Sequence, residues 1–176
     1  MVAIDNTFLT LMLNPGKGRP PQDPSTKKPV DRIADRIDNL HEDLDSESER
    51  MILPTPVLSE FLIFVGKDGP SYLEKLSGMK TILVKPCDQV AAIELAALEV
   101  EDRSKTGKRA GSASPWAKLR FDRQIVAIAK TNGAKRIYSD DEDVMKFSTR
   151  VGIQVIPTWE LPLPSAKQIV IPYEQS

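Results

Sequence analysis

FDRQIVAIAKTNGAKRIYSDDEDV, residues 121–144, joins a helix, a turn, a strand and an acidic run in one continuous stretch. The spacing of its first apolar residues predicts a helix, and Asn132 and Gly133 form a typical helix end. Residues 136–139, with Ile137 and Tyr138 at their centre, then predict a short strand, and acidic residues follow it directly. In open α/β sheets, ligands bind beyond the carboxyl ends of the strands. The stretch therefore predicts one unit of such a sheet together with a functional edge.

Short apolar runs alternate with helical segments along the rest of the chain. The other predicted strands cover residues 2–5, 51–53, 81–84 and 153–156, and the predicted helices cover residues 7–13, 30–44, 54–65, 70–76, 88–101, 116–131 and 141–150. This alternation is typical of α/β proteins, in which helices cover both faces of a buried parallel sheet. We therefore predict a three-layer α/β/α sandwich with a mostly parallel sheet of about five strands.

Composition places the chain among ordinary globular proteins. It has 176 residues, 40% hydrophobic and 28% charged, with a net charge of −1. This length suits one domain, which we assign to residues 1–160, followed by a Pro-rich tail at 161–176. Within the tail, IVI at 169–171 fits either an edge strand or a segment that packs on a partner. The residues between 14 and 29, rich in Pro, Gly and Lys, predict a flexible loop.

The expected lack of a targeting signal and the single cysteine both favour a cytoplasmic location. The first apolar stretch is interrupted by Asp5 and Asn6 and has no basic region before it, so we expect no signal peptide. No stretch is long enough to cross a bilayer. The single cysteine, Cys87, cannot form an internal disulfide. A reducing cytoplasm is therefore the expected location.

Charge is distributed unevenly. The segment 103–123 carries seven basic residues and one acid, whereas SDDED at 139–143 is acidic. Each run taken alone is typical of a solvated loop, but a basic surface beside an acidic pocket suits a nucleic-acid backbone held next to a cation. The residues expected to contact phosphates are Arg103, Lys105, Lys108, Arg109 and Lys118.

Acidic residues fall where the carboxyl edge of the sheet is expected. Asp5 ends the first strand, Glu60 lies inside an apolar helix after the second, and Asp122 precedes the fourth. Asp140, Asp141 and Asp143 follow the fourth strand. Each except Asp143 has a structural alternative. Asp5, and Asp140 or Asp141, can cap helices. Glu60 can pair with a Lys or Arg, and Asp122 can pair with Arg120 or Arg123.

A common cause for these positions is a cation site. Carboxylates gathered at one edge repel one another unless cations neutralise them. Without His or Cys among the ligands, oxygen donors favour Mg²⁺ or Mn²⁺ over zinc. One or two such ions would suit hydrolysis of a phosphodiester.

Three segments resemble the PIN domain family: VAIDNTFL at 2–9, ILPTPVLSEFL at 52–62 and the stretch 121–144. PIN domains are Mg²⁺- or Mn²⁺-dependent nucleases and include the toxins of VapBC-type toxin–antitoxin pairs. The resemblance implies the catalytic and metal-binding residues Asp5, Glu60, Asp122 and Asp141, with Asp143 as a further ligand. It also implies supporting roles for Thr7 and Ser139, and a lesser one for Asp140.

The resemblance implies a metal-dependent endoribonuclease, with an antitoxin protein and a homodimer as expected partners. A dimer also fits the helix at 54–65, which is apolar on more than one face. Three alternatives stay open. One is a structure-specific DNA nuclease, since no residue in the sequence is a recognisable contact for a 2′-hydroxyl. Another is a non-catalytic module of the same fold that binds nucleic acid or protein. The third is a small-molecule phosphatase, which would use similar metals but has less need of the basic segment.

Overall fold

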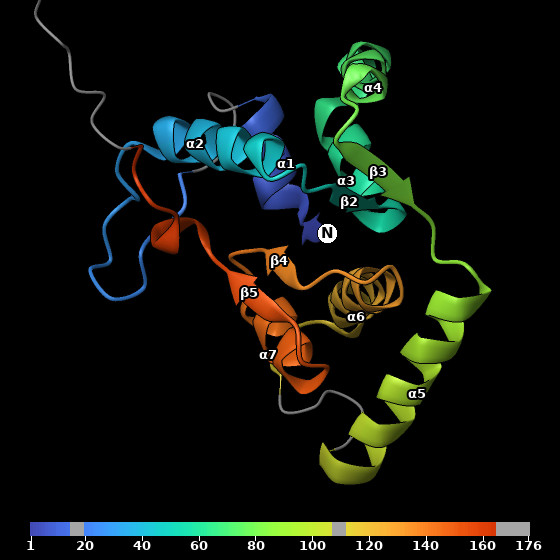
Figure 1. Ribbon diagram of the computed structural model, residues 1–176. Coiled ribbons are helices and arrows are strands. Elements are labelled where there is room, and N and C mark those ends of the chain that lie inside the picture. Colours follow the sequence, from blue (N-terminus) through green and yellow to red (C-terminus); the bar gives the residue numbers. More distant parts are fainter. Residues whose placement is uncertain (15–19, 107–111, 165–176) are drawn as a thin grey trace, which may run out of the picture.

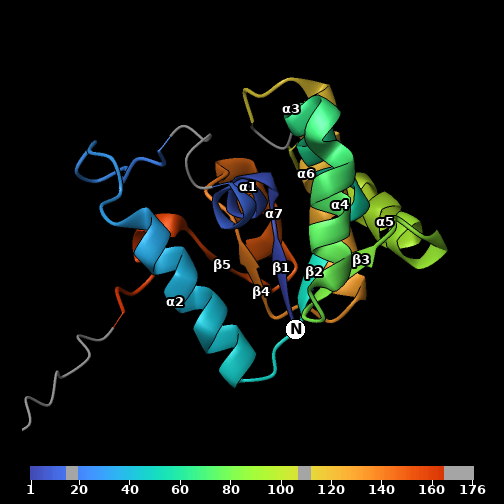
Figure 2. The ribbon, with the colours of Figure 1, turned by 90° about the horizontal axis from the view of Figure 1, so that it is seen from above.

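The computed structural model describes residues 1–14, 20–106 and 112–164, except for the side chains at 102, 103, 105 and 106. Its sheet has five strands: β1 (Val2–Ile4), β2 (Met51–Pro54), β3 (Ile82–Lys85), β4 (Arg136–Tyr138) and β5 (Gln154–Ile156). The strand order is β3-β2-β1-β4-β5, and every adjacent pair is parallel. Figure 2 shows this order across the molecule, with α2 toward β5 and α4 and α5 toward β3. The predicted parallel sheet of five strands is confirmed.

In the described residues, seven α-helices occupy the segments where helices were predicted. They are α1 (Asn6–Leu13), α2 (Ile33–Ser46), α3 (Thr55–Val65), α4 (Gly69–Gly78), α5 (Gln89–Thr106), α6 (Trp116–Thr131) and α7 (Glu142–Arg150), with 3₁₀ turns at Gly66–Asp68 and Thr158–Glu160. The end of α6 is as predicted, because Gly133 adopts a left-handed φ of 74° that an L side chain rarely takes. None of the described helices is long and apolar enough to cross a membrane.

Helix α2 begins later than predicted. The apolar spacing suggested a start at Val30, but Arg32 adopts a left-handed φ of 48° and the helix begins at Ile33. The amide of Val30 donates instead to the carbonyl of Pro21, and Gln22 forms an antiparallel bridge with Pro29. The described part of the predicted loop is therefore held by backbone hydrogen bonds, and residues 15–19 lie outside the description.

The sheet separates two apolar cores, and helices cover both of its faces (Figure 1). Val2 and Ile4 of β1 pack with α1, α2 and α3 in one core, whereas Ala3 packs with α6 and α7 in the other. This alternation follows from the pleat, which points successive side chains to opposite faces. The predicted three-layer arrangement is confirmed.

The C-terminal part of the described chain closes one side of the sheet. Leu161 is 2% exposed and belongs to the core formed with α1 and α2, although the sequence placed it at the start of the tail. The Arg36 guanidinium donates a hydrogen bond to its carbonyl. The described core thus extends one residue past 160, and the IVI segment lies outside the described residues.

The chain changes direction between β1 and β4. From β1 it proceeds to β2 and β3 on one side, whereas β4 and β5 are added on the other side. In parallel α/β sheets such a switch point opens a crevice beyond the carboxyl ends of the two strands. Asp5 follows β1 directly, and the acidic run follows β4. The topology therefore brings these two acidic segments together.

Candidate metal-binding pocket

A pocket of about 380 Å³ opens at this switch point. It is lined by Asp5, Asn6, Thr7, Glu60, Ala117, Lys118, Phe121, Asp122, Asp141 and Val144. The lining residues come from the end of β1 and the start of α1, from α3, from α6, and from the segment that joins β4 to α7. All four acids that the sequence singled out for catalysis thus face one cavity.

Asp5 is buried and uses its two carboxylate oxygens differently. Its Oδ1 accepts a 2.9 Å hydrogen bond from the amide of Phe8 and so caps α1, as the structural alternative predicted. Its Oδ2 accepts a 2.5 Å hydrogen bond from the hydroxyl of Ser139. Burial raises the pKa of Asp5 to about 7, although the hydrogen bonds from Ser139 and Phe8 act in the opposite direction. The capping role and a place in the pocket are therefore compatible.

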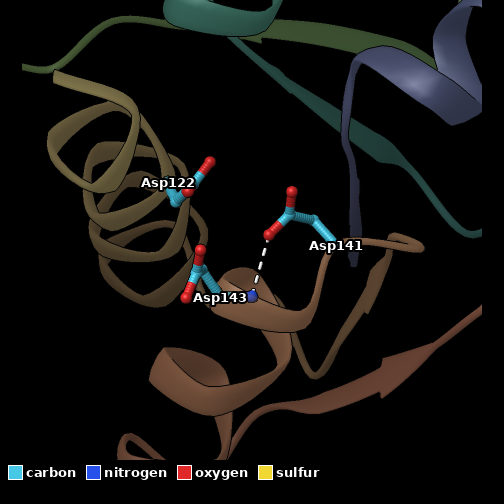
Figure 3. Close-up of side chains that lie close together, drawn as sticks. All are labelled: Asp122, Asp141 and Asp143. Carbon is cyan, nitrogen blue, oxygen red and sulfur yellow. Dashed lines mark hydrogen bonds between the residues drawn. The ribbon is translucent and has the colours of Figure 1, made fainter. Parts of the chain in front are cut away.

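Asp141 divides its oxygens in the same way. Its Oδ1 accepts hydrogen bonds from the amides of Asp143 at 2.8 Å and Val144 at 3.4 Å, and so caps α7 (Figure 3). Its Oδ2 lies 2.7 Å from the Lys118 ammonium. The backbone amide of Asp141 in turn donates to the Ser139 hydroxyl at 3.1 Å. One carboxylate oxygen of Asp141 thus caps α7, while the other pairs with Lys118.

Asp122, Asp141 and Asp143 form a tight group, which we call the aspartate cluster (Figure 3). One oxygen from each lies within 4.8 Å of the others. Burial raises the pKa of Asp122 to about 6, helped by Asp141 and Asp143 and opposed by the Lys118 ammonium. For Asp143, burial acts upward, but hydrogen bonds from nearby serines and Lys118 outweigh it and lower the pKa. The cluster is an assembly of oxygen donors with an unfavourable charge density.

Lys118 lies inside this cluster. Its Nζ is 2.9 Å from Asp122 Oδ2 and 3.4 Å from Asp143 Oδ2, in addition to the contact with Asp141. Although burial lowers the pKa of Lys118, its hydrogen bonds to Asp141 and Asp122 outweigh this effect and raise the pKa above the ordinary value. The partner of Asp122 is therefore Lys118, one helical turn away, rather than Arg120 or Arg123.

Glu60 lies across the pocket on α3. Its side chain is exposed, as is that of Thr7, and both line the cavity. Glu60 forms no ion pair with any described residue, so the structural alternative of a Lys or Arg partner is not observed in the described chain. Two of its apolar neighbours, Val57 and Phe61, are fully buried in the core that α3 forms with β1 and α1.

Asp140 lies outside the pocket, and the remaining basic candidates have no described side chains. The Asp140 carboxylate accepts hydrogen bonds from the Thr158 amide at 2.6 Å and hydroxyl at 2.8 Å, and it does not line the pocket. Arg103 and Lys105 lie in α5, where only their backbone is described. Lys108 and Arg109 lie in the undescribed segment 107–111. Their predicted phosphate contacts stay predictions.

Three residues near the cluster were not singled out from the sequence. Asn6 lines the pocket, and its buried Oδ1 has no hydrogen-bond partner among the described residues. Ser114 donates a 2.6 Å hydrogen bond to Asp143 Oδ2. Phe121 is 39% exposed at the pocket. The position of Asn6 next to Asp5 could have indicated a place in the pocket. No such sequence signal existed for Ser114, because its partner Asp143 is 29 residues away.

The donor set fits a hard divalent cation. The pocket and the adjoining cluster offer carboxylate oxygens from four different segments, with the unpartnered amide oxygen of Asn6 beside them. No His or Cys lines the described cavity. Oxygen-only ligands suit Mg²⁺ or Mn²⁺ rather than zinc. The residues present are therefore compatible with the ions that the sequence suggested.

Comparison with solved structures identifies the fold. Over 89% of this chain and 97% of the other, the structure superimposes on a chain of the DNA-bound VapBC of Salmonella typhimurium, with a TM-score of 0.53 and 17% sequence identity. It also matches VapC20 of Mycobacterium tuberculosis, a toxin that cleaves the sarcin–ricin loop, over 88% and 99% of the two chains, with a TM-score of 0.52 and 15% identity. No family model and no curated protein matches the sequence. The chain therefore has a VapC-like fold, the PIN-type α/β/α sandwich predicted above.

Proposed function

We propose that this protein is a metal-dependent endoribonuclease and the toxin of a VapBC-type toxin–antitoxin pair. The observation that carries the proposal is the pocket at the switch point, which gathers Asp5, Glu60, Asp122 and Asp141 from four segments of the chain. The VapC-like fold supports it, since one structural neighbour is a nucleolytic toxin. The single cysteine suits action in the cytoplasm.

The four acids, with Asp143 as a further ligand, would hold one or two Mg²⁺ or Mn²⁺ ions. Such ions would assist hydrolysis of a phosphodiester in two ways: they lower the pKa of a bound water, and they neutralise negative charge on the phosphate. The side chains thus serve mainly to position cations. Ser139 supports this role because its hydroxyl fixes Asp5 Oδ2 and the backbone of Asp141 at the same time.

Two further features suit a single-stranded nucleic acid. Phe121 presents a partly exposed ring at the pocket, where a base can stack without sequence preference. The basic residues between 103 and 109 precede α6 in the sequence, and we propose that they contact the phosphate backbone. Cleavage would then produce a 5′-phosphate and a free 3′-hydroxyl, with the 3′-oxygen as the leaving group.

Partners are proposed from the exposed apolar surface of α3. Ile63 is 79% exposed and Phe64 is 50% exposed, and Leu58 and Leu62 line a shallow groove beside them. Exposed apolar side chains grouped on one helix indicate a protein interface. We propose that this surface forms a homodimer, and that an antitoxin binds the toxin elsewhere.

The proposal is tested by Mn²⁺ calorimetry and by cleavage of RNA and DNA of the same sequence. Wild-type protein is expected to bind one or two ions and to cleave RNA only when Mg²⁺ or Mn²⁺ is present. Glu60→Gln and Asp122→Asn should lose binding and cleavage while their circular dichroism is unchanged. Glu74→Gln, an exposed glutamate on α4, is the matched control.

The outcomes separate the alternatives. Cleavage of DNA in preference to RNA would favour the structure-specific DNA nuclease. Metal binding without cleavage of either polymer would favour a non-catalytic binding module. Wild-type protein that binds no Mn²⁺ would contradict the metal site altogether.

A further inference from the structure

The Lys118 ammonium occupies the centre of the aspartate cluster. Its Nζ lies 2.7 Å from Asp141 Oδ2, 2.9 Å from Asp122 Oδ2 and 3.4 Å from Asp143 Oδ2. The same three residues supply the oxygens that lie within 4.8 Å of one another. The three carboxylates of the cluster are thus already paired with a cation, the Lys118 ammonium of the same chain.

Electrostatics explain why a cation must be there. Asp122 and Asp143 are 7% and 5% exposed, so water screens their charges poorly. Among the described residues that line the pocket, Lys118 is the only basic one. In its absence, the metal-free protein would hold three neighbouring carboxylates without an opposite charge between them, an arrangement that like-charge repulsion disfavours.

A divalent ion and the ammonium require the same space. Mg²⁺ binds carboxylate oxygens at about 2.0–2.1 Å. Oxygens that converge on an ammonium at 2.7 and 2.9 Å enclose the position that such an ion would take. The two cations therefore compete for the oxygens of Asp122 and Asp141.

Lys118 is able to leave without disturbing the fold. It lies in the first turn of α6, and its side chain is 41% exposed. The long aliphatic stem of a lysine rotates easily and keeps its ammonium in water when it extends outward. Asp141 and Asp5 retain their helix-capping hydrogen bonds through their other oxygens, so the backbone around the pocket is held independently of Lys118.

We propose that Lys118 is a tethered counter-ion, which occupies the cation position of the metal-free protein and is displaced when a divalent cation binds. The inference rests on the proposed metal site and adds an exchange step to it. Binding of one ion would release one ammonium, and because Lys118 lines the same pocket as Phe121, this ammonium would be free to pair with a phosphate of the substrate. Lys118 thus neutralises carboxylates in one state and a phosphate in the other.

Calorimetric titration with Mn²⁺ tests the exchange. Lys118→Met keeps the aliphatic stem and removes the competing charge, so its Mn²⁺ affinity is expected to rise by about tenfold, the size of a charge-assisted hydrogen bond. The matched control is Lys130→Met on the same helix, whose ammonium pairs with Glu94 at 2.5 Å and is exposed to a similar extent. Its Mn²⁺ affinity should equal that of the wild type.

Thermal unfolding gives a second measurement. In EDTA, Lys118→Met should melt below the wild type, because its carboxylates are unneutralised, whereas in saturating Mn²⁺ the difference should vanish or reverse. Unchanged or weaker Mn²⁺ binding by Lys118→Met, with normal binding by the wild type, would overturn the exchange while the metal site stands. If neither protein binds Mn²⁺, the metal site itself fails and the exchange fails with it.

A measurement on the wild type covers the case in which Lys118→Met does not fold. Nitrogen-15 spectra of lysine ammonium groups report on ammonium groups protected by ion pairs. The Lys118 signal is expected in the metal-free protein and should shift or disappear as Mg²⁺ is added, while the Lys130 signal stays in place. A Lys118 signal that persists unchanged at saturating Mg²⁺ would contradict the displacement.

Discussion

The hydroxyl of Ser139 donates a 2.5 Å hydrogen bond to Asp5 Oδ2, although the two residues are 134 positions apart in the sequence. The same hydroxyl accepts a 3.1 Å hydrogen bond from the backbone amide of Asp141. One fully buried oxygen therefore connects the acid after β1 with the acid after β4. The relative position of two proposed metal ligands depends on this serine.

Ser139→Ala is expected to weaken both stability and metal binding. Removal of the hydroxyl leaves the buried Asp5 Oδ2 without its donor, which costs about 1–3 kcal/mol in the free energy of unfolding. Urea denaturation measures this loss, and Mn²⁺ calorimetry should show reduced affinity because Asp5 and Asp141 are no longer linked. Ser148→Ala is the control, since Ser148 is equally buried but its hydroxyl has no hydrogen-bond partner among the described residues. Equal losses in the two variants would contradict the bridging role.

Asp5→Asn is expected to stabilise the metal-free protein at high pH. The folded-state pKa of Asp5 is raised to about 7 by burial, so the wild type keeps a disfavoured charge above pH 7 and loses it by protonation below that pH. Each unit of raised pKa corresponds to about 1.4 kcal/mol. In EDTA at pH 8 the variant should therefore gain about 1 kcal/mol or more, and the gain should shrink toward pH 5. Urea denaturation at both pH values tests this, and a gain independent of pH would contradict it.

Asp140→Asn and Asp141→Asn should have opposite effects, although the two residues are adjacent. Asp140 binds the amide and hydroxyl of Thr158, so its amide variant should lose about 1–2 kcal/mol of stability and keep its Mn²⁺ affinity. Asp141 faces the pocket, so its variant should lose Mn²⁺ affinity and keep its helix cap, because Asn also caps helices. Parallel calorimetry and urea denaturation separate the two roles. Loss of Mn²⁺ binding in Asp140→Asn would contradict this division.

Ile63→Glu is expected to dissociate the proposed homodimer. Ile63 is 79% exposed on α3. In the dimer, the carboxylate of Glu at this position would be buried in an apolar interface without water or a partner, which disfavours association. Sedimentation at micromolar concentration should give a dimer for the wild type and a monomer for the variant. Val100→Glu on α5, 68% exposed on a different surface, is the control. A dimer that is lost in Val100→Glu but kept in Ile63→Glu would place the interface on α5.

The fold was largely predictable because its determinants are local. Short apolar runs between helices define a parallel sheet, and Gly133 marks the end of α6 through a backbone conformation that glycine adopts readily. The start of α2 was predicted wrongly, since it depends on a left-handed Arg32, a conformation that arginine does not signal. Apolar spacing extends a predicted helix until a recognised breaker appears.

The pocket was predictable in composition but not in its internal contacts. Parallel strands bring their carboxyl ends to one edge, so acids placed after β1 and β4 were expected to meet there. Lys118 was assigned to phosphate from the basic run around it, yet it lies among Asp122, Asp141 and Asp143. Its spacing of four residues from Asp122 was visible in the sequence. Its contacts across 23 and 25 positions depend on how α6 and α7 pack, which no local pattern encodes.

The pairing of β1 with β4 also sets when the acidic pocket can exist during synthesis. β1 begins at the second residue, but its partner β4 ends at Tyr138, and Asp141 follows later still. A ribosome must therefore translate the chain past Ser139 before Asp5 can meet it. If the protein cleaves RNA as proposed, a nascent chain that has not yet reached Asp141 has no complete centre with which to attack the ribosome or messenger that is producing it.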